Sequence, residues 1–255
     1  MKLLPTLLSV MAMLIGAASV HAQTTTTETL TFDNNQLPSG WNFVVSGPGN
    51  NVQIVNQRLE VGQVDTYAGI SKSIDSTGAT QIKIEYDSNI ANVGSGQGSA
   101  AILARDPTNW RAEYIYSSMN KYGWGQDSML FNSLAKLAGS PDVGLYSNVV
   151  SPAVFGNYHM SAVFENGQIS QTVTNLDTGA TFSSGVIAAP GFVLSNMHGV
   201  VLWGDTTTGS SAWIDNATIT VTAVPEPETY AMFLAGLGLV GAIARRRQSD
   251  KSSVV

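Results

Sequence analysis

The protein is a chain of 255 residues that carries 12 Lys and Arg side chains against 18 Asp and Glu, a net charge of −6, and no cysteine. The lack of cysteine excludes disulfides, thiolate metal sites and a cysteine nucleophile, and the acidic balance disfavours nucleic acid as a partner. Residues 23–224 hold seven basic against fifteen acidic side chains, are rich in Thr, Ser, Asn, Gly, Val and Ile, and suffice for one domain with a substantial core.

Residues 1–22 have the features of a signal peptide. Lys2 precedes an apolar stretch from Leu7 to Val20, and Val20-His21-Ala22 places small residues where signal peptidase needs them. Cleavage after this triplet would start the mature chain at Gln23. The alternative, an uncleaved anchor helix, is disfavoured because the apolar stretch is short and because Pro5 and Gly16 disfavour a continuous helix.

Residues 23–223 are expected to form one all-β domain. Short segments with alternating apolar and polar residues follow one another with turn residues between them, which predicts an antiparallel two-sheet sandwich. The strongest turn signal is Asn166-Gly167, because Asn-Gly suits a tight hairpin. The expected strands are Thr29–Asp33, Trp41–Ser46, Val52–Val55, Arg58–Val61, Tyr67–Ile74, Gln81–Tyr86, Ala100–Arg105, Arg111–Ser117, Val143–Val149, Tyr158–Glu165, Ile169–Thr174, Thr181–Val186, Gly199–Gly204 and Trp213–Thr222. For Ser128–Leu137, the spacing of apolar residues favours one or two helical turns on a loop.

Catalytic groups are not evident in this domain. Glu85 and Asp87 fall on one face of their strand, but without the third alternating acid that sandwich-type hydrolases carry, a solvated strand end is the stronger interpretation. His159 and His198 are the only histidines after residue 22, and both are interpreted as half-buried strand positions. No Gly-x-Ser-x-Gly turn accompanies them. The sequence therefore predicts that the protein is not an enzyme.

Aromatic residues gather in one part of the domain, where Trp110, Tyr114, Tyr116, Tyr122 and Trp124 lie within 15 residues of one another. Sugar rings have an apolar face that stacks on aromatic side chains and hydroxyls that bond to polar neighbours. Trp110, Tyr122 and Trp124 are therefore the predicted carbohydrate contacts, with Trp124 between two glycines as the best of them. The alternative is that these rings fill the core.

Three stretches, taken in order, resemble the concanavalin A-like lectin and laminin-G-like jelly rolls. They are Leu30–Asp33 with Leu37–Trp41, then Tyr158–Gly167, and finally Gly199–Trp203 with Trp213–Ile219. The resemblance implies a jelly-roll sandwich in which the first and last strands are neighbours.

That neighbourhood would bring Asp33 and Asp215 to one edge of the sandwich. With Asn34, Asn216 and nearby carbonyls they form a candidate structural calcium site, and no other cofactor is expected. The alternative is that both aspartates cap strand ends and bond to local amides.

Residues 224–248 form a separate segment. Val224, Pro225, Glu226 and Pro227 are followed by an apolar run from Tyr230 to Ala244 and by Arg245, Arg246 and Arg247, and residues 249–255 are a polar tail. As a helix the run would reach only about 22 Å, short of the roughly 30 Å core of a bilayer, and the arginines would hold its end in the cytoplasm. The order of these parts resembles the PEP-CTERM sorting signal, which implies recognition by an exosortase of a Gram-negative, exopolysaccharide-producing bacterium.

These expectations combine into one hypothesis: an exported cell-surface or matrix protein whose non-catalytic jelly roll binds polysaccharide. Its partners would be signal peptidase and exosortase during export, with transient anchoring in the inner membrane. Two alternatives stay open. One is a structural or adhesive module without a sugar site, and the other is a divergent polysaccharide hydrolase.

Overall fold

The computed structural model describes residues 23–45, 51–90, 97–121, 128–137, 139–150, 154–224 and 233–241. The expected signal peptide, Pro225–Pro227 and Arg245–Arg247 lie outside these ranges. The chain divides into two compact units, Thr25–Thr222 and a unit made of the two chain ends, Met1–Thr24 with Ala223–Val255.

The unit of the chain ends contains a helix over 233–241, inside the apolar run for which a C-terminal helix is expected. Within the described ranges, no helix has the length and apolar character needed to cross a membrane.

The unit Thr25–Thr222 is all-β and antiparallel, as predicted. Two 3-10 turns, η1 (Asp33–Asn35) and η2 (Leu194–Asn196), interrupt the strands. The strands are β1 (Thr24–Leu30), β2 (Asn42–Val45), β3 (Asn51–Val55), β4 (Arg58–Ser73), β5 (Ala79–Ile90), β6 (Gln97–Ala104), β7 (Tyr114–Lys121), β8 (Met129–Lys136), β9 (Val143–Val150), β10 (Gly156–Glu165), β11 (Gln168–Asn175), β12 (Thr181–Ala188) and β13 (Gly199–Ala223).

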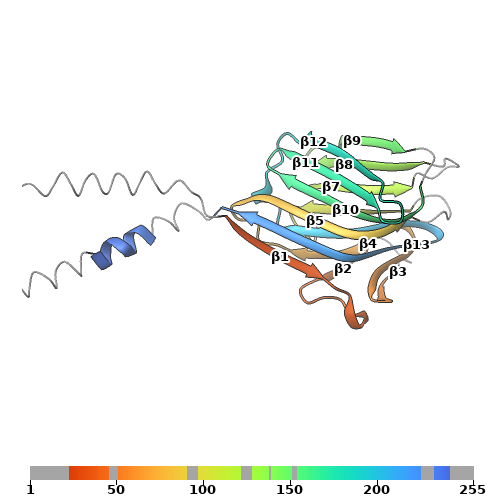
Figure 1. The fold of residues 1–255 in the computed structure, drawn as a ribbon, viewed down its shortest axis with the longest axis horizontal. Coiled ribbons are helices and arrows are strands. Elements are labelled where there is room, and N and C mark those ends of the chain that lie inside the picture. Colours follow the sequence, from red (N-terminus) through yellow and green to blue (C-terminus); the bar gives the residue numbers. More distant parts are fainter. Residues whose placement is uncertain are drawn as a thin grey trace, which may run out of the picture. The chain divides into compact units, whose positions relative to one another are not determined.

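The strands form two packed sheets (Figure 1). The β10 sheet has the order β12-β11-β10-β5-β13, and the β7 sheet has the order β13-β6-β7-β8-β9. Strand β13 belongs to both sheets because it is 25 residues long. Its first residues pair with β6 and with the end of β4, and its later residues pair with the start of β4. Strand β1 also pairs with β13, so the first and last strands are neighbours, as the jelly-roll resemblance implies.

Two pairs of predicted strands are in fact single long strands. Arg58–Val61 and Tyr67–Ile74 are both parts of β4, and Gly199–Gly204 and Trp213–Thr222 are both parts of β13. The pairing between β4 and β13 continues through shifts of register in its middle. The interruption in the hydrophobic pattern therefore marks a β-bulge region and not a turn.

The prediction of helical turns over Ser128–Leu137 is wrong, because these residues contain strand β8. Its side chains alternate strictly between buried and half-buried positions, with Met129 and Phe131 in the core and Leu130 and Leu134 on the outer side. Both faces of β8 contact apolar neighbours. Apolar residues therefore occur on both sides of the strand and produce a spacing that also fits a helix.

One large hydrophobic core lies between the sheets. Alternate residues of β5 and β10, such as Ile84, Tyr86 and Phe164, point into it and are fully buried. The amide of Gln171 on β11 crosses the core and donates from Nε2 to the carbonyl oxygen of Ser118 on β7, at 2.8 Å. This bond fixes the two sheets relative to each other at a buried position.

Candidate functional site

The outer face of the β7 sheet is unusually apolar for a surface that points away from the core. Ile102 on β6 lies beside Tyr116 on β7 and Val201 on β13, and Tyr116 lies beside Leu134 on β8. These residues belong to a second hydrophobic cluster, separate from the main core. We call this surface the β7 face. Its buried members are Ala100, Ile102, Ala104, Trp110, Tyr114, Val201 and Trp203.

Aromatic rings cover much of the β7 face. The rings of Tyr114 and Tyr116 are stacked, with centroids 6.0 Å apart and planes 15° apart. Trp110 meets Tyr114 edge to face at 5.8 Å. The two tyrosines are two residues apart on β7, so the alternation of the strand puts both rings on the same side.

A network of amides and hydroxyls continues the β7 face along β7 and β8. Asn132 donates from Nδ2 to the hydroxyl oxygen of Tyr116 at 3.3 Å and accepts a hydrogen bond from Ser118. Asn120 donates to Ser118 Oγ at 2.9 Å and to Asn132 Oδ1 at 3.2 Å. We call these four residues the amide network. Tyr116, Asn120 and Asn132 are half-buried, so part of each side chain reaches solvent.

The β7 face thus combines the half-buried ring of Tyr116, stacked on buried Tyr114, with side chains that both donate and accept hydrogen bonds. The network orients its amides in advance, so a ligand does not need to order them on binding. A ligand ring with apolar faces and hydroxyl groups at its edge suits such a surface. The apolar face of the ligand can stack on an aromatic side chain, and its hydroxyls can form hydrogen bonds with the amides.

Of the three predicted carbohydrate contacts, only Trp110 lies among the described residues. Trp110 belongs to the β7 face but is only 9% exposed, with the guanidinium of Arg111 5.1 Å from its ring centroid. Tyr122 and Trp124 lie outside the described residues. Of the aromatic group found in the sequence, Tyr114 and Tyr116 are the residues that the fold brings together with Trp110.

The candidate calcium ligands are on separate elements. Asp33 is the first residue of η1, and Asp215 lies on β13 and accepts a hydrogen bond from the backbone N–H of Asn216 at 2.8 Å. Among the described residues, no three His, Cys, Asp or Glu side chains gather in a geometry for a metal ion. A calcium site at this edge stays a prediction.

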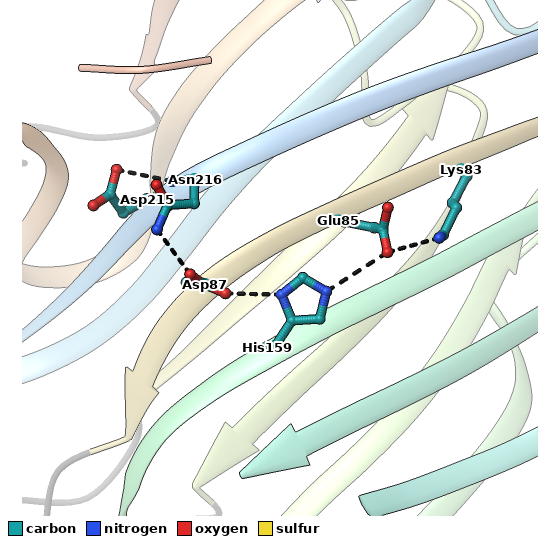
Figure 2. Close-up of polar contacts among 6 residues, drawn as sticks. All are labelled: Lys83, Glu85, Asp87, His159, Asp215 and Asn216. Carbon is teal, nitrogen blue, oxygen red and sulfur yellow. Dashed lines mark hydrogen bonds and ion pairs between the residues drawn. The ribbon is translucent and has the colours of Figure 1, made fainter. Parts of the chain in front are cut away.

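A second cluster of polar side chains lies on the outer face of the β10 sheet (Figure 2). It brings together residues that are far apart in the sequence. Glu85 and Asp87 on β5 point to the same side, as predicted, and His159 on β10 lies between them. His159 Nδ1 is 2.8 Å from Asp87 Oδ1, and Nε2 is 3.6 Å from Glu85 Oε1. Asn216 donates to Asp87 Oδ2 at 2.9 Å, and Lys83 Nζ lies 2.7 Å from Glu85.

These contacts shift two ionisation equilibria. The hydrogen bond to Asp87 raises the pKa of His159, against the effect of burial, and Glu85 adds to the rise. Burial raises the pKa of Asp87, but hydrogen bonds from His159 and Asn216 outweigh it and leave this pKa below its usual value. Each acid is thus paired with a basic side chain. We therefore interpret the cluster as a charged tie between strands β5, β10 and β13.

Known proteins resemble both the C-terminal segment and the β domain of this chain. Residues 223–248 match the PEP-CTERM protein-sorting motif, which indicates export and sorting to the cell surface. The motif implies processing that depends on an exosortase. The sequence matches none of the curated proteins with which it was compared.

Solved structures share the fold at low sequence identity. A carbohydrate-binding module of the evolved Dit protein of Lactobacillus casei BL23 phage J-1 has a TM-score of 0.59 at 16% identity, covering 80% of this chain and 99% of that one. Basic winged bean lectin has a TM-score of 0.52 at 8% identity, covering 80% and 100%. A xylan β-1,4-xylosidase from Bacillus halodurans C-125 has a TM-score of 0.53 at 10% identity, but only 39% of that chain is covered. The fold is therefore the lectin-like jelly roll.

Proposed function

We propose that this exported protein binds polysaccharide at the cell surface or in the extracellular matrix, through the β7 face, and does not cleave it. The observation that carries the proposal is the amide network beside the half-buried ring of Tyr116, which stacks on the buried ring of Tyr114. Rings next to preordered amides on an outer sheet face are a suitable surface for a sugar polymer. The lectins and carbohydrate-binding modules that share the fold support this choice.

The ligand is a neutral polysaccharide in this proposal. The amide network consists of uncharged groups, and the chain as a whole carries a charge of −6. An acidic polymer would be repelled by this charge unless a cation bridged the two. Binding to an acidic polymer is therefore expected only with calcium and should disappear with a chelator.

We expect no catalysis because of the chemistry of Glu85 and Asp87. Retaining and inverting glycosidases need two carboxyl groups free to act on one bond, one of them as an acid. Glu85 and Asp87 are each tied to a basic side chain, and His159 is shared between them. The xylosidase that shares the fold does not favour hydrolysis here, because only 39% of that protein is covered.

Retardation of the purified protein in native gels that contain neutral polysaccharides tests the proposal. We expect the wild type to be retarded by at least one polymer, and Asn132→Ala to lose the retardation because its amide holds Tyr116 and Ser118. Thr172→Ala, on the outer face of the β10 sheet, is the control and should behave as the wild type. A wild type that no polysaccharide retards would refute the proposal and favour a structural or adhesive module.

A further inference from the structure

The loop between β6 and β7, residues 105–113, separates two open grooves. The Glu113 groove has a volume of about 670 Å³, and its lining includes Arg105, Asp106, Asn109 and Glu113. The Phe43 groove has a volume of about 450 Å³, and its lining includes Asn42, Phe43, Ser71, Lys72 and Thr108. Pro107 lines both grooves, so it forms the ridge between them. Both volumes lie in the range of roughly 300–1,000 Å³ that is usual for sites of small ligands.

The Glu113 groove contains charged side chains, and two of them compensate each other. Arg105 Nη1 lies 3.0 Å from Glu113 Oε2, and the Arg105 side chain is 60% exposed while that of Glu113 is 10% exposed. Because the Arg105 side chain is mostly exposed, its guanidinium has N–H donors within reach of solvent. Hydroxyl groups of a sugar can accept from these donors and can donate to the carboxylate of Asp106.

The Phe43 groove contains hydroxyl and amide side chains. Asn42 and Ser71 are partners in the β2–β4 pairing and Thr108 adds a hydroxyl, whereas Phe43 pairs with Ile70 and points to the opposite side of these strands. Lys72 in the same groove is paired with Glu28, with 2.6 Å between Lys72 Nζ and the carboxylate. Uncharged hydroxyl and amide groups suit a neutral sugar, and because Lys72 is paired, the groove offers no uncompensated lysine for an acidic one.

The ridge between the grooves is held firmly. Asp106 Oδ1 accepts hydrogen bonds from the N–H and the hydroxyl of Thr108, at 2.8 and 2.7 Å. Pro107 packs on the start of β13, since a Cβ on Gly199 would lie 2.7 Å from the Pro107 side chain. Trp110 anchors the loop on the β7 face by its contact with Tyr114. A ligand that crosses the ridge therefore meets a preformed surface.

We propose that one neutral polysaccharide chain crosses Pro107 and occupies both grooves at the same time, so the protein recognises an internal stretch of polymer. This inference rests on the proposed function and adds a second contact region to the β7 face. Two open grooves that share a ridge suit a continuous chain, whereas a single sugar can fill only one of them. Binding in the second groove is then intramolecular, so affinity for the polymer should exceed affinity for the disaccharide by about 10²-fold or more.

The test uses the full protein and the neutral polysaccharide that retards it most, together with the disaccharide and longer oligosaccharides of that polymer. Asn42→Ala removes an amide from one groove and Asn109→Ala removes an amide from the other. Arg105 is left intact because its removal would strand the buried Glu113 carboxylate. Leu176→Ala, which removes an exposed apolar side chain that lines neither groove, is the matched control. Dissociation constants are measured by calorimetry, and thermal unfolding confirms that each variant is folded.

We expect the wild-type affinity to rise with ligand length, and each groove variant to weaken polymer binding by about fivefold or more while disturbing the disaccharide less. The control should match the wild type. If Asn132→Ala abolishes polymer binding but both groove variants bind polymer as the wild type does, the two-groove inference is wrong and the proposed function stands. If the wild type binds neither polymer nor disaccharide, both are wrong.

Discussion

The imidazole Nδ1 of His159 on β10 lies 2.8 Å from Oδ1 of Asp87 on β5, in a contact that joins positions 72 residues apart in the chain. The two residues are direct partners in the β5–β10 pairing. Glu85 and Lys83 lie on the same side, and Asn216 reaches Asp87 from β13. The pair therefore adds a charged contact to three strands whose backbones are already hydrogen-bonded.

This pair should make stability depend on pH in a defined window. The raised pKa of His159 contributes stability below about pH 6.5 that is lost as the pH rises through the folded value. The lowered pKa of Asp87 contributes stability above about pH 3.8 that is lost as the pH falls through the folded value. His159→Gln should therefore cost most between these limits, by less than about 1 kcal/mol because the side chains are partly exposed.

Urea unfolding at pH 5.5 and at pH 9 measures this effect. Ser161→Ala, on the same outer face of β10 but without a titratable group, is the control. A cost of His159→Gln that is the same at both pH values would contradict the assignment.

Position 156, at the start of β10, should accept only glycine because the Asp177 carboxylate occupies the space that a Cβ would need. Gly156 has a φ of +146°, and a Cβ there would overlap the Asp177 carboxylate, which accepts the N–H of Asn157 at 2.9 Å. Gly156→Ala is expected to destabilise the protein by more than about 1 kcal/mol. Gly167→Ala is the matched control, because Gly167 has a φ of +70° but open space around its Cβ position. Equal costs for the two variants in urea unfolding would show that the Asp177 contact is unimportant.

Trp110 should contribute mainly to stability. Its ring is 9% exposed and packs against Tyr114, so Trp110→Ala would leave a cavity and cost about 3–5 kcal/mol. Trp213→Ala is the comparison, since Trp213 is only half-buried and lies under Arg58; it should cost less. The midpoints of urea unfolding distinguish the two. A Trp110→Ala variant as stable as the wild type would mean that the ring is available for stacking on a ligand.

Processing at the two ends gives a further prediction. The mature protein should begin at or near Gln23, and residues after Pro227 should be removed or held in membrane. Intact-mass measurement on protein from its native host checks this, with protein from a strain that lacks the exosortase as the control. A full-length mass in the native host would contradict it.

The sequence predicted the parts of this molecule that depend on local chemistry. Strict alternation in Gln81–Tyr86 and the Asn166-Gly167 turn are local signals, and the strands β5, β10 and β11 lie where they indicated. The amide network was missed because Asn132 lies in β8, whose two apolar-contacting faces resemble a helical pattern. The pairing of His159 with Asp87 depends on strand register, which the sequence of either strand alone does not determine.

The central claim, that the β7 face binds neutral polysaccharide without cleaving it, is tested most directly by calorimetry with an assay for released reducing ends on the same sample. We predict binding heat for the wild type and no new reducing ends. Tyr116→Phe, which keeps the ring but removes the hydroxyl that Asn132 contacts, should bind more weakly, and Thr172→Ala should bind as the wild type does. Wild-type protein that gives no heat with any neutral polymer, or that releases reducing ends, would contradict the claim.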